Sequence, residues 1–446
     1  MSRPPTPGKP ASRRDLLRWG LLLGASAPVL SACGGLSTSG GGGDGVSFVS
    51  TQFTPVEEAE NLRGILRRVY SGGVNYVVGD SSQLSAQIRS QAASGTMNID
   101  LIGGLHGDFA QLGEGLLTDL SDLMDELSVG GYSAEFTELA GLGGTGAFYI
   151  PWTQATYLLA AHESALEHLP PGAEVDALTY DQLLDWVIAA RRANDDRPVF
   201  GLPGGPEGLL HRFIQGHLYP SFTGGVVSTF SGPDAVAMWE YFRELWANST
   251  AASTNFDFMQ EPLSSGEVTV AWDHAARLVG APANNPEQWR MVPSPAGPRG
   301  RGYMSVLLGL GIPQGSEKVE EAKAVIRSLS TPDAQIELLR TNSFFPTVDT
   351  PIPGDLPPAI LLEADAVKAQ QDSPDTIVSL PPVGLGQRDG EMSKVFRDAF
   401  TAIVLDGADI RATLDAQAGN MQTILDEADV PCWAPDPDTG ERCRVA

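Results

Sequence analysis

Val46-Ser47-Phe48-Val49-Ser50-Thr51 opens the stretch of sequence that decides the fold, which extends to residue 102. Its apolar side chains predict a strand, and further strands are expected at Val74–Val78 and at Ile99-Asp100-Leu101-Ile102. Apolar residues at helical spacing fill both intervals between these strands. The order strand, helix, strand, helix, strand calls for a parallel sheet with right-handed crossovers, and therefore for an α/β fold.

Both expected helices carry recognisable start signals. Thr54-Pro55-Val56-Glu57 combines a capping box with proline at the first helical position. Asp80 or Ser81 is expected to cap the second helix, which Gly95 would end. These signals place polar residues directly after the strands that precede them.

The first 45 residues differ in composition from the rest of the chain. Arg13-Arg14 precedes a short apolar stretch that ends at Leu30-Ser31-Ala32-Cys33, the pattern of an export signal. The arginine pair resembles a twin-arginine signal, and the last four residues resemble the lipobox of bacterial lipoproteins. We therefore expect a signal peptide over 1–32 and an acylated Cys33, followed by a Gly/Ser tether over 33–45. The protein would then be anchored by lipid to the outer face of a membrane; an ordinary signal peptide with a chance cysteine is the alternative.

Composition and cysteine positions indicate which partners and which compartment the protein can have. The chain has 29 Lys and Arg against 55 Asp and Glu, a net charge of −26, which argues against a nucleic-acid partner. Beyond residue 35 no apolar run is long enough to span a membrane. In an oxidising compartment Cys432 and Cys443 are expected to pair as a disulfide, with two free surface thiols as the alternative.

Motifs for enzyme chemistry are largely missing. There is no G-x-S-x-G elbow, P-loop or H-E-x-x-H. His211 and His217 are six residues apart, which does not place two ligands on one helix face. The string Gly141–Gly146 matches G-x-G-x-x-G but precedes an apolar strand, so we interpret it as a loop. We expect neither a metal nor a cofactor, while abundant carboxylates leave a secreted glycoside hydrolase open as an alternative.

Five short motifs occur in a characteristic order along the chain. They are Ile99-Asp100-Leu101-Ile102-Gly103, Ile150-Pro151-Trp152, Val270-Ala271-Trp272-Asp273, Gly302-Tyr303-Met304 and Ser330-Thr331-Pro332. In this order, and with the lipobox leader, residues 46–446 resemble the family 1 extracellular solute-binding proteins, the maltose-binding-protein-like receptors of sugar ABC importers. Each motif is weak alone, and the pocket residues depart from the maltose-binding pattern, so maltose itself is not implied.

The resemblance implies a two-lobed periplasmic-binding-protein fold, each lobe a mostly parallel sheet flanked by helices. The lobes would be joined by crossing strands near Ile150–Tyr157 and Tyr303–Ile312. The implied boundaries are 46–152 plus 308–350 for the N-lobe and 153–307 plus 351–446 for the C-lobe. The implied function is that of a monomeric binding protein, not an enzyme, that passes a di- or oligosaccharide to an ABC permease. A non-sugar solute such as a glycerophosphodiester or a peptide is the alternative within this class.

Ligands of open parallel sheets bind beyond the carboxyl ends of the strands, which locates the candidate site. Sugars need aromatic faces for their C–H patches and carboxylates, amides or imidazoles for their hydroxyls. The residues that meet both conditions are Gln52, Asp80, His106, Asp108, Trp152, Gln154, Trp272, Asp273, His274 and Tyr303, with Gln387 and Arg388 added from a Gly-rich loop.

Several of these candidates have a purely structural alternative. Trp272 ends an alternating strand and could be core packing, while Asp273 could cap the following helix. His106 and Asp108 could belong to a solvated turn, and Trp152 could pack at the hinge. We expect Trp272 to stack on a sugar ring, with Asp273 or His274 hydrogen-bonded to hydroxyls.

Overall fold

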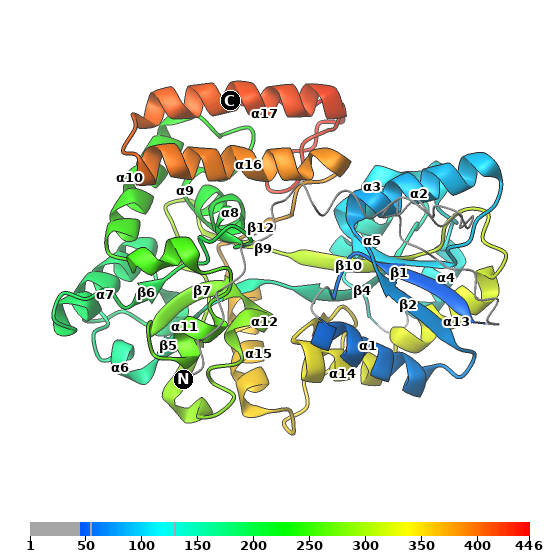
Figure 1. Ribbon diagram of the computed structural model, residues 1–446, viewed down its shortest axis with the longest axis horizontal. Helices are drawn as coiled ribbons and strands as arrows, with labels where there is room; N and C mark the ends of the chain where they lie inside the picture. Colours follow the sequence, from blue (N-terminus) through cyan, green and yellow to red (C-terminus); the bar gives the residue numbers. More distant parts are fainter. Residues whose placement is uncertain (1–44, 54–55, 129–130) are drawn as a thin grey trace, which may run out of the picture. The chain divides into compact units, whose positions relative to one another are not determined.

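The computed structural model describes residues 45–53, 56–128 and 131–446. Residues 1–44, with the expected signal peptide and Cys33, lie outside this description, as do Thr54 and Pro55 of the expected capping box. The described chain forms two main sheets flanked by helices, with a two-stranded sheet beside the second (Figure 1).

A six-stranded sheet organises the N-lobe in the order β11-β4-β10-β3-β1-β2. Its strands are β1 (Val46–Ser50), β2 (Val74–Val78), β3 (Leu101–Leu105), β4 (Ile150–Ala155), β10 (Val306–Gly311) and β11 (Phe345–Pro346). β1 pairs in parallel with β2 and β3, as the sequence predicts. The third predicted strand begins two residues later than expected and reaches Leu105, so it ends next to the residues of the site.

Helices cover both faces of this sheet. They are α1 (Val56–Val69), α2 (Ser81–Ser94), α3 (His106–Leu112), α4 (Ser121–Leu127), α5 (Ala134–Ala140), α13 (Val319–Leu329) and α14 (Pro332–Asn342). α1 and α14 pack against each other on one side of the sheet, and α2 and α3 lie on the other (Figure 1). The Gln83 backbone N–H donates to Asp80 at 3.1 Å, which confirms the predicted cap of α2.

The C-lobe contains a four-stranded sheet in the order β6-β7-β5-β8 and a parallel pair, β12 with β9. Its strands are β5 (Tyr157–His162), β6 (Phe200–Gly201), β7 (Val270–His274), β8 (Trp289–Val292), β9 (Arg301–Met304) and β12 (Thr376–Ser379). The helices are α6 (Glu163–Leu166), α7 (Tyr180–Ala193), α8 (Leu210–Phe213), α9 (Tyr219–Thr223), α10 (Pro233–Ala247), α11 (Gln260–Ser264), α12 (Ala275–Leu278), α15 (Pro358–Gln371), α16 (Asp389–Phe400) and α17 (Ile410–Ala428).

Both main sheets are mixed, which corrects the expectation of mostly parallel sheets. β10 runs antiparallel to β3 and to β4, and β5 runs antiparallel to β7 and to β8. The reason is the connectivity: β4 enters from one lobe and β10 returns from the other, so the two lie side by side in opposite directions. The β-α-β pattern predicts parallel pairing only for strands that a helix connects within one lobe.

Two pairs of consecutive strands pass between the lobes. β4 and β5 flank Thr156, and β9 and β10 flank Ser305. The hydroxyl of Thr156 donates to the Met304 carbonyl oxygen at 2.8 Å and accepts from the Gln370 side-chain amide at 3.0 Å, all in the buried interior. This placement lies within the crossing regions implied by the resemblance; the boundaries given for the two lobes stay a prediction.

Two further properties of the described chain bear on function. Cys432 and Cys443 form a disulfide, as expected. Among the described residues, no helix combines the length and the apolar character needed to cross a bilayer.

Candidate functional site

Three parallel strands of the N-lobe end at one edge of their sheet and bring polar residues together there. Thr51 and Gln52 follow β1, Asp80 and Ser81 follow β2, and α3 begins at His106 directly after β3. This is the edge at which open α/β sheets bind ligands. The same local rule that predicts the strands therefore predicts this half of the site.

Asp108 connects the three strand ends. Its carboxylate accepts hydrogen bonds from the Thr51 hydroxyl at 2.8 Å, from the Ser81 hydroxyl and from the Leu105 backbone N–H at 2.9 Å. Burial raises the pKa of Asp108 above its ordinary value, while these hydrogen bonds act in the opposite direction. Asp108 thus fixes the shape of the site, and its acceptor capacity is largely used within the protein.

His106 lies beside this connection with its ring against the core. Its Nδ1 is 3.0 Å from the Tyr149 hydroxyl. Burial lowers the pKa of His106 to about 4, so the imidazole is neutral at neutral pH. A neutral imidazole has one donor and one acceptor nitrogen, which suits a ligand hydroxyl.

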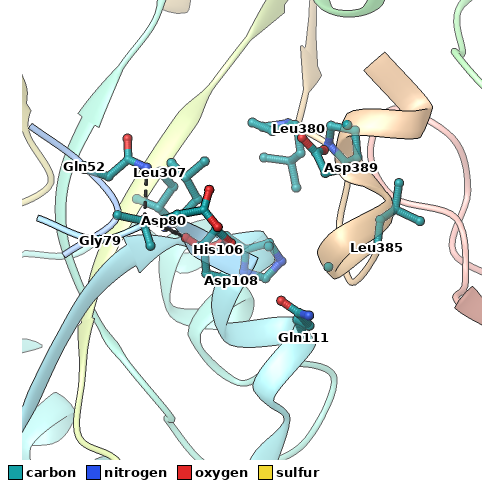
Figure 2. A pocket seen from close by; sticks show the side chains of 18 of the residues that line it. Gln52, Gly79, Asp80, His106, Asp108, Gln111, Leu307, Leu380, Leu385 and Asp389 are labelled. Carbon is teal, nitrogen blue, oxygen red and sulfur yellow. Dashed lines mark hydrogen bonds between the residues drawn. The ribbon is translucent and has the colours of Figure 1, made fainter. Parts of the chain in front are cut away.

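A cavity of ≈ 680 Å³ opens at these strand ends and is closed on its far side by the C-lobe. In Figure 2, Gln52, Asp80 and His106 lie on one side, and Leu380, Leu385 and Asp389 lie on the other. Cavities of roughly 300–1,000 Å³ are typical of small-molecule sites. The described residues that line it are Thr51, Gln52, Val78, Gly79, Asp80, Ser81, Leu105, His106, Gly107, Asp108, Gln111, Arg212, Leu307, Leu380, Pro381, Pro382, Leu385, Gly386, Asp389 and Gly390.

The C-lobe contributes one ion pair to the cavity. Arg212 on α8 approaches Asp389 at the start of α16 to 3.5 Å, and it also donates to the Gln215 side chain at 3.0 Å. Arg212 is the one cation among the lining residues, which also include the carboxylates of Asp80 and Asp108. The cavity is therefore acidic on balance.

Four of the predicted site residues line this cavity, namely Gln52, Asp80, His106 and Asp108. Sequence reasoning missed Gln111, Arg212, Leu307, Leu380 and Asp389, among others. Asp389 lies in the Gly-rich loop that the sequence singled out, two positions after the predicted Gln387. Arg212 adjoins His211, for which the sequence analysis weighs only a metal-binding role. In the described part of the chain, no group of three or more metal-binding side chains occurs.

Trp272 does not line the cavity. Its side chain is fully buried, stacked on Tyr157 with ring centroids 4.9 Å apart and packed against Phe213 and His217. We therefore revise its assignment from ligand stacking to core packing. Trp152 is revised in the same way, because it is fully buried against Phe48 and Phe53.

The neighbours of Trp272 also serve the fold. Buried Asp273 accepts from the backbone N–H groups of Met259 at 2.8 Å and His274 at 2.7 Å, which joins α11 to β7. His274 caps α12 by accepting from the Ala276 N–H at 3.3 Å. We revise both residues from ligand contacts to structural contacts.

Gln154, Tyr303 and Arg388 are also absent from the described lining of the cavity. Gln154 donates to the Pro346 carbonyl at 3.0 Å and so connects β4 to β11. Tyr303 is buried on β9. Arg388 forms ion pairs with Glu391 and Glu427, and the backbone of Gln387 lies in the short helical turn that contains Arg388.

The sequence matches the family model described as bacterial extracellular solute-binding protein over residues 73–336. The chain belongs to this family. The match confirms the family resemblance, and it identifies a class of binding proteins rather than enzymes. No curated protein matches the sequence of this solute-binding protein significantly.

Solved structures show the same two-lobed fold. The sugar-binding protein MalE from Xanthomonas citri superimposes with a TM-score of 0.69 at 15% identity, covering 86% of this chain and 97% of that chain. Maltose-bound MalE3 from T. maritima gives 0.67 at 18% identity, covering 85% and 99%. UgpB from Mycobacterium tuberculosis, in complex with glycerophosphocholine, gives 0.67 at 18% identity, covering 86% and 99%.

Proposed function

We propose that this solute-binding protein captures a carbohydrate, a di- or oligosaccharide, in the cavity between its lobes and delivers it to an ABC import permease. The cavity itself is the observation that carries the proposal, because it joins the polar strand ends of one lobe to a wall of the other. Such a cavity closes around a solute only when both lobes contact it. A permease that senses the closed state could then distinguish loaded from empty receptor.

The lining favours recognition by hydrogen bonds. Gln52, Gln111 and His106 offer donors and acceptors for hydroxyl groups, and Leu307 and Leu385 offer apolar faces. No Trp, Tyr or Phe is among the residues that line the cavity in the described chain. The proposal therefore does not include the stacking of an aromatic side chain on the sugar that the sequence led us to expect.

Charge favours a neutral sugar over a glycerophosphodiester, the alternative within this class. Asp80, Asp108 and Asp389 face one cavity with Arg212 as their cation, and Arg212 is already paired with Asp389. A phosphodiester would meet net repulsion and no unpaired cation among the described lining residues. A neutral polyol meets no such repulsion, and its hydroxyls can form hydrogen bonds with the side chains of Gln52, Gln111 and His106.

The remaining parts of the proposal rest on the leader sequence and the family. We infer an acylated Cys33 that holds a monomeric protein at the outer face of the membrane, on a Gly/Ser tether of about a dozen residues. Such a tether has a root-mean-square reach of roughly 20 Å. This reach would keep the receptor close to its permease.

Calorimetric titration with maltose, maltotriose, diacetylchitobiose and glycerophosphocholine tests this function. We expect saturable binding of at least one sugar at one site per chain, no heat from glycerophosphocholine, and no release of reducing ends over hours. Binding of glycerophosphocholine alone would support the phosphodiester alternative. Release of reducing ends would support the glycoside hydrolase.

A further inference from the structure

The wall that the C-lobe presents to the cavity has little regular structure of its own. Residues 380–388 follow β12 and contain two prolines and two glycines before α16 begins at Asp389. Leu380, Pro382 and Leu385 from this segment all line the cavity. A loop of this kind keeps a fixed position only if neighbouring segments hold it.

The neighbour that holds this wall is the C-terminal tail, residues 430–446. The Leu380 backbone N–H donates to the Ala434 carbonyl oxygen at 3.0 Å. Trp433, with 6% of its surface exposed, shares a gap of only ≈ 10 Å³ with Leu380 and Pro382. The wall therefore rests directly on the tail.

A second contact lies at Gly384. A Cβ atom there would approach Val430 Cγ1 to 3.0 Å, and the backbone has φ +74°. Glycine is the residue that adopts this conformation without strain. The wall and the tail are thus in contact on both sides of Pro382.

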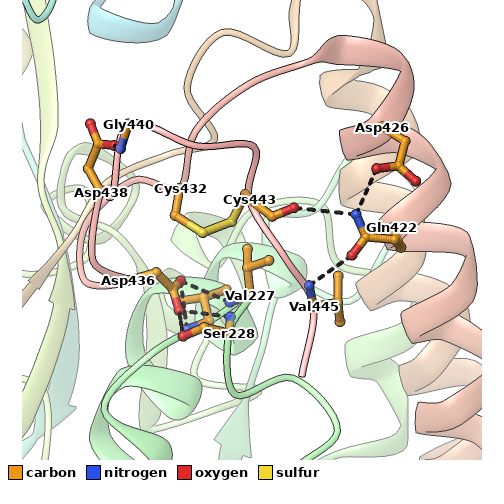
Figure 3. Close-up of a disulfide and its surroundings, with 11 residues drawn as sticks. Val227, Ser228, Gln422, Asp426, Cys432, Asp436, Asp438, Gly440, Cys443 and Val445 are labelled. Carbon is orange, nitrogen blue, oxygen red and sulfur yellow. Dashed lines mark hydrogen bonds between the residues drawn. A yellow bond between two sulfur atoms is a disulfide. The ribbon is translucent and has the colours of Figure 1, made fainter.

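The tail is itself anchored at two points (Figure 3). Asp436, 3% exposed, accepts the backbone N–H groups of Val226, Val227 and Ser228 at 2.9–3.0 Å. The other point lies at the disulfide that closes the tail: Cys432 is bonded to Cys443, whose carbonyl oxygen accepts from the Gln422 side-chain amide of α17 at 3.3 Å. Three backbone N–H groups on one carboxylate, two of them buried, form charge-assisted hydrogen bonds that a neutral amide replaces only in part.

We propose that the disulfide-closed tail is a positioning element for the solute cavity, whose contacts with Leu380 and Pro382 set the place of the C-lobe wall. The inference deepens the proposed function by assigning the disulfide to the binding site instead of to the stability of the whole molecule. Loss of the disulfide or of the Asp436 anchor releases the wall and leaves the N-lobe side of the cavity intact.

Hydrogen exchange followed by mass spectrometry tests the proposal without any solute. The variants are Cys432→Ser/Cys443→Ser and, independently, Asp436→Asn. The matched control is Asp438→Asn, which alters an exposed carboxylate that bonds only within the tail loop, to the Gly440 N–H at 2.7 Å. We expect exchange in peptides spanning 376–390 to become at least tenfold faster in both test variants, with 319–342 (α13 and α14 of the N-lobe, away from the wall) unchanged. The control should resemble the wild type.

Two results would overturn the proposal. Faster exchange confined to 430–446 would mean that the wall does not depend on the tail. Equal acceleration in 319–342, which does not contact the wall, would mean general destabilisation. Because the measurement uses the unliganded protein, it tests the role of the tail even if no sugar in the titration panel binds. In that case only the proposed function fails.

Discussion

Gly107 lies so close to Pro382 that a Cβ atom on Gly107 would stand 2.8 Å from the Pro382 carbonyl oxygen. Gly107 belongs to α3 of the N-lobe, and Pro382 belongs to the wall of the C-lobe, so this contact joins the two sides of the cavity. The opposing atom is backbone and cannot rotate away. The size of residue 107 therefore limits how closely the cavity walls approach.

We predict that Gly107→Ala weakens sugar binding. The added methyl group forces the walls apart, and overpacking of this kind costs about 1–3 kcal/mol, roughly a factor of 5 to 150 in affinity. Calorimetry with the sugar that binds the wild type measures the loss. Gly115→Ala is the matched control, because a Cβ at Gly115 meets no atom within 4 Å. Unchanged affinity in Gly107→Ala would show that this contact does not limit closure.

Trp272→Ala is expected to destabilise the protein without changing the intrinsic affinity for sugar. The indole is fully buried against Tyr157, and truncation of a large aromatic residue in a core costs about 3–5 kcal/mol. Urea unfolding measures the stability, and titration below the unfolding range measures the affinity. Phe258→Ala, which truncates an aromatic residue with 43% exposure, should cost far less. Near-normal stability of Trp272→Ala combined with loss of sugar binding would instead support stacking of Trp272 on the sugar.

Glu363 on α15 makes the stability of the protein depend on pH. The side chain is fully buried, and burial raises the pKa of Glu363 from 4.5 to about 8, against a smaller opposing effect of the Ser343 hydroxyl. The folded state thus holds this proton more tightly than the unfolded chain does. The resulting stability is complete below about pH 4.5 and is lost as the pH rises toward 8.

We predict that Glu363→Gln removes this loss and raises the unfolding free energy at pH 8 relative to the wild type, by up to a few kcal/mol as an order of magnitude. Denaturant unfolding at unit steps from pH 5 to pH 9 measures it. Asp365→Asn, at an exposed position of the same helix, is the control for a lost surface charge. Parallel pH profiles for the wild type and Glu363→Gln would disprove the buried-carboxyl account.

Cys33→Ala should move the protein from the membrane fraction to the soluble exported fraction of a suitable bacterial host. The reason is the sequence Leu30-Ser31-Ala32-Cys33 behind the arginine pair. Each buried acyl methylene contributes about 0.8 kcal/mol to membrane binding, so loss of the lipid should be decisive. Identical partitioning of wild type and variant would exclude the anchor.

The N-lobe half of the site could be predicted because it depends on local signals. Gln52, Asp80 and His106 each follow a strand that periodicity reveals, and parallel strands end at one edge of a sheet. Arg212 and Asp389 arrive from separate helices of the other lobe. No local sequence pattern predicts that these two residues meet at the cavity, because their positions depend on the crossing strands and on the packing of α8 against α16.

Trp272 and Asp273 show a different limit of sequence reasoning. An alternating strand tells which side chains share a face, but both faces of this sheet are covered, so the pattern does not distinguish core from cavity. Asp273 lies one residue before the end of β7, where a ligand residue would be expected, yet its carboxylate accepts from the N–H of Met259, 14 residues earlier at the N-cap of α11. The structural alternatives considered for both residues account for their positions.

Hydrogen exchange in the presence and absence of the panel sugar with the highest affinity tests the central claim most directly, because it locates the bound solute. The account predicts that saturating sugar slows exchange both in 101–112, at the end of β3 and in α3, and in 380–390, the C-lobe wall. Protection confined to one of these segments, or located elsewhere on the chain, would contradict capture between the lobes.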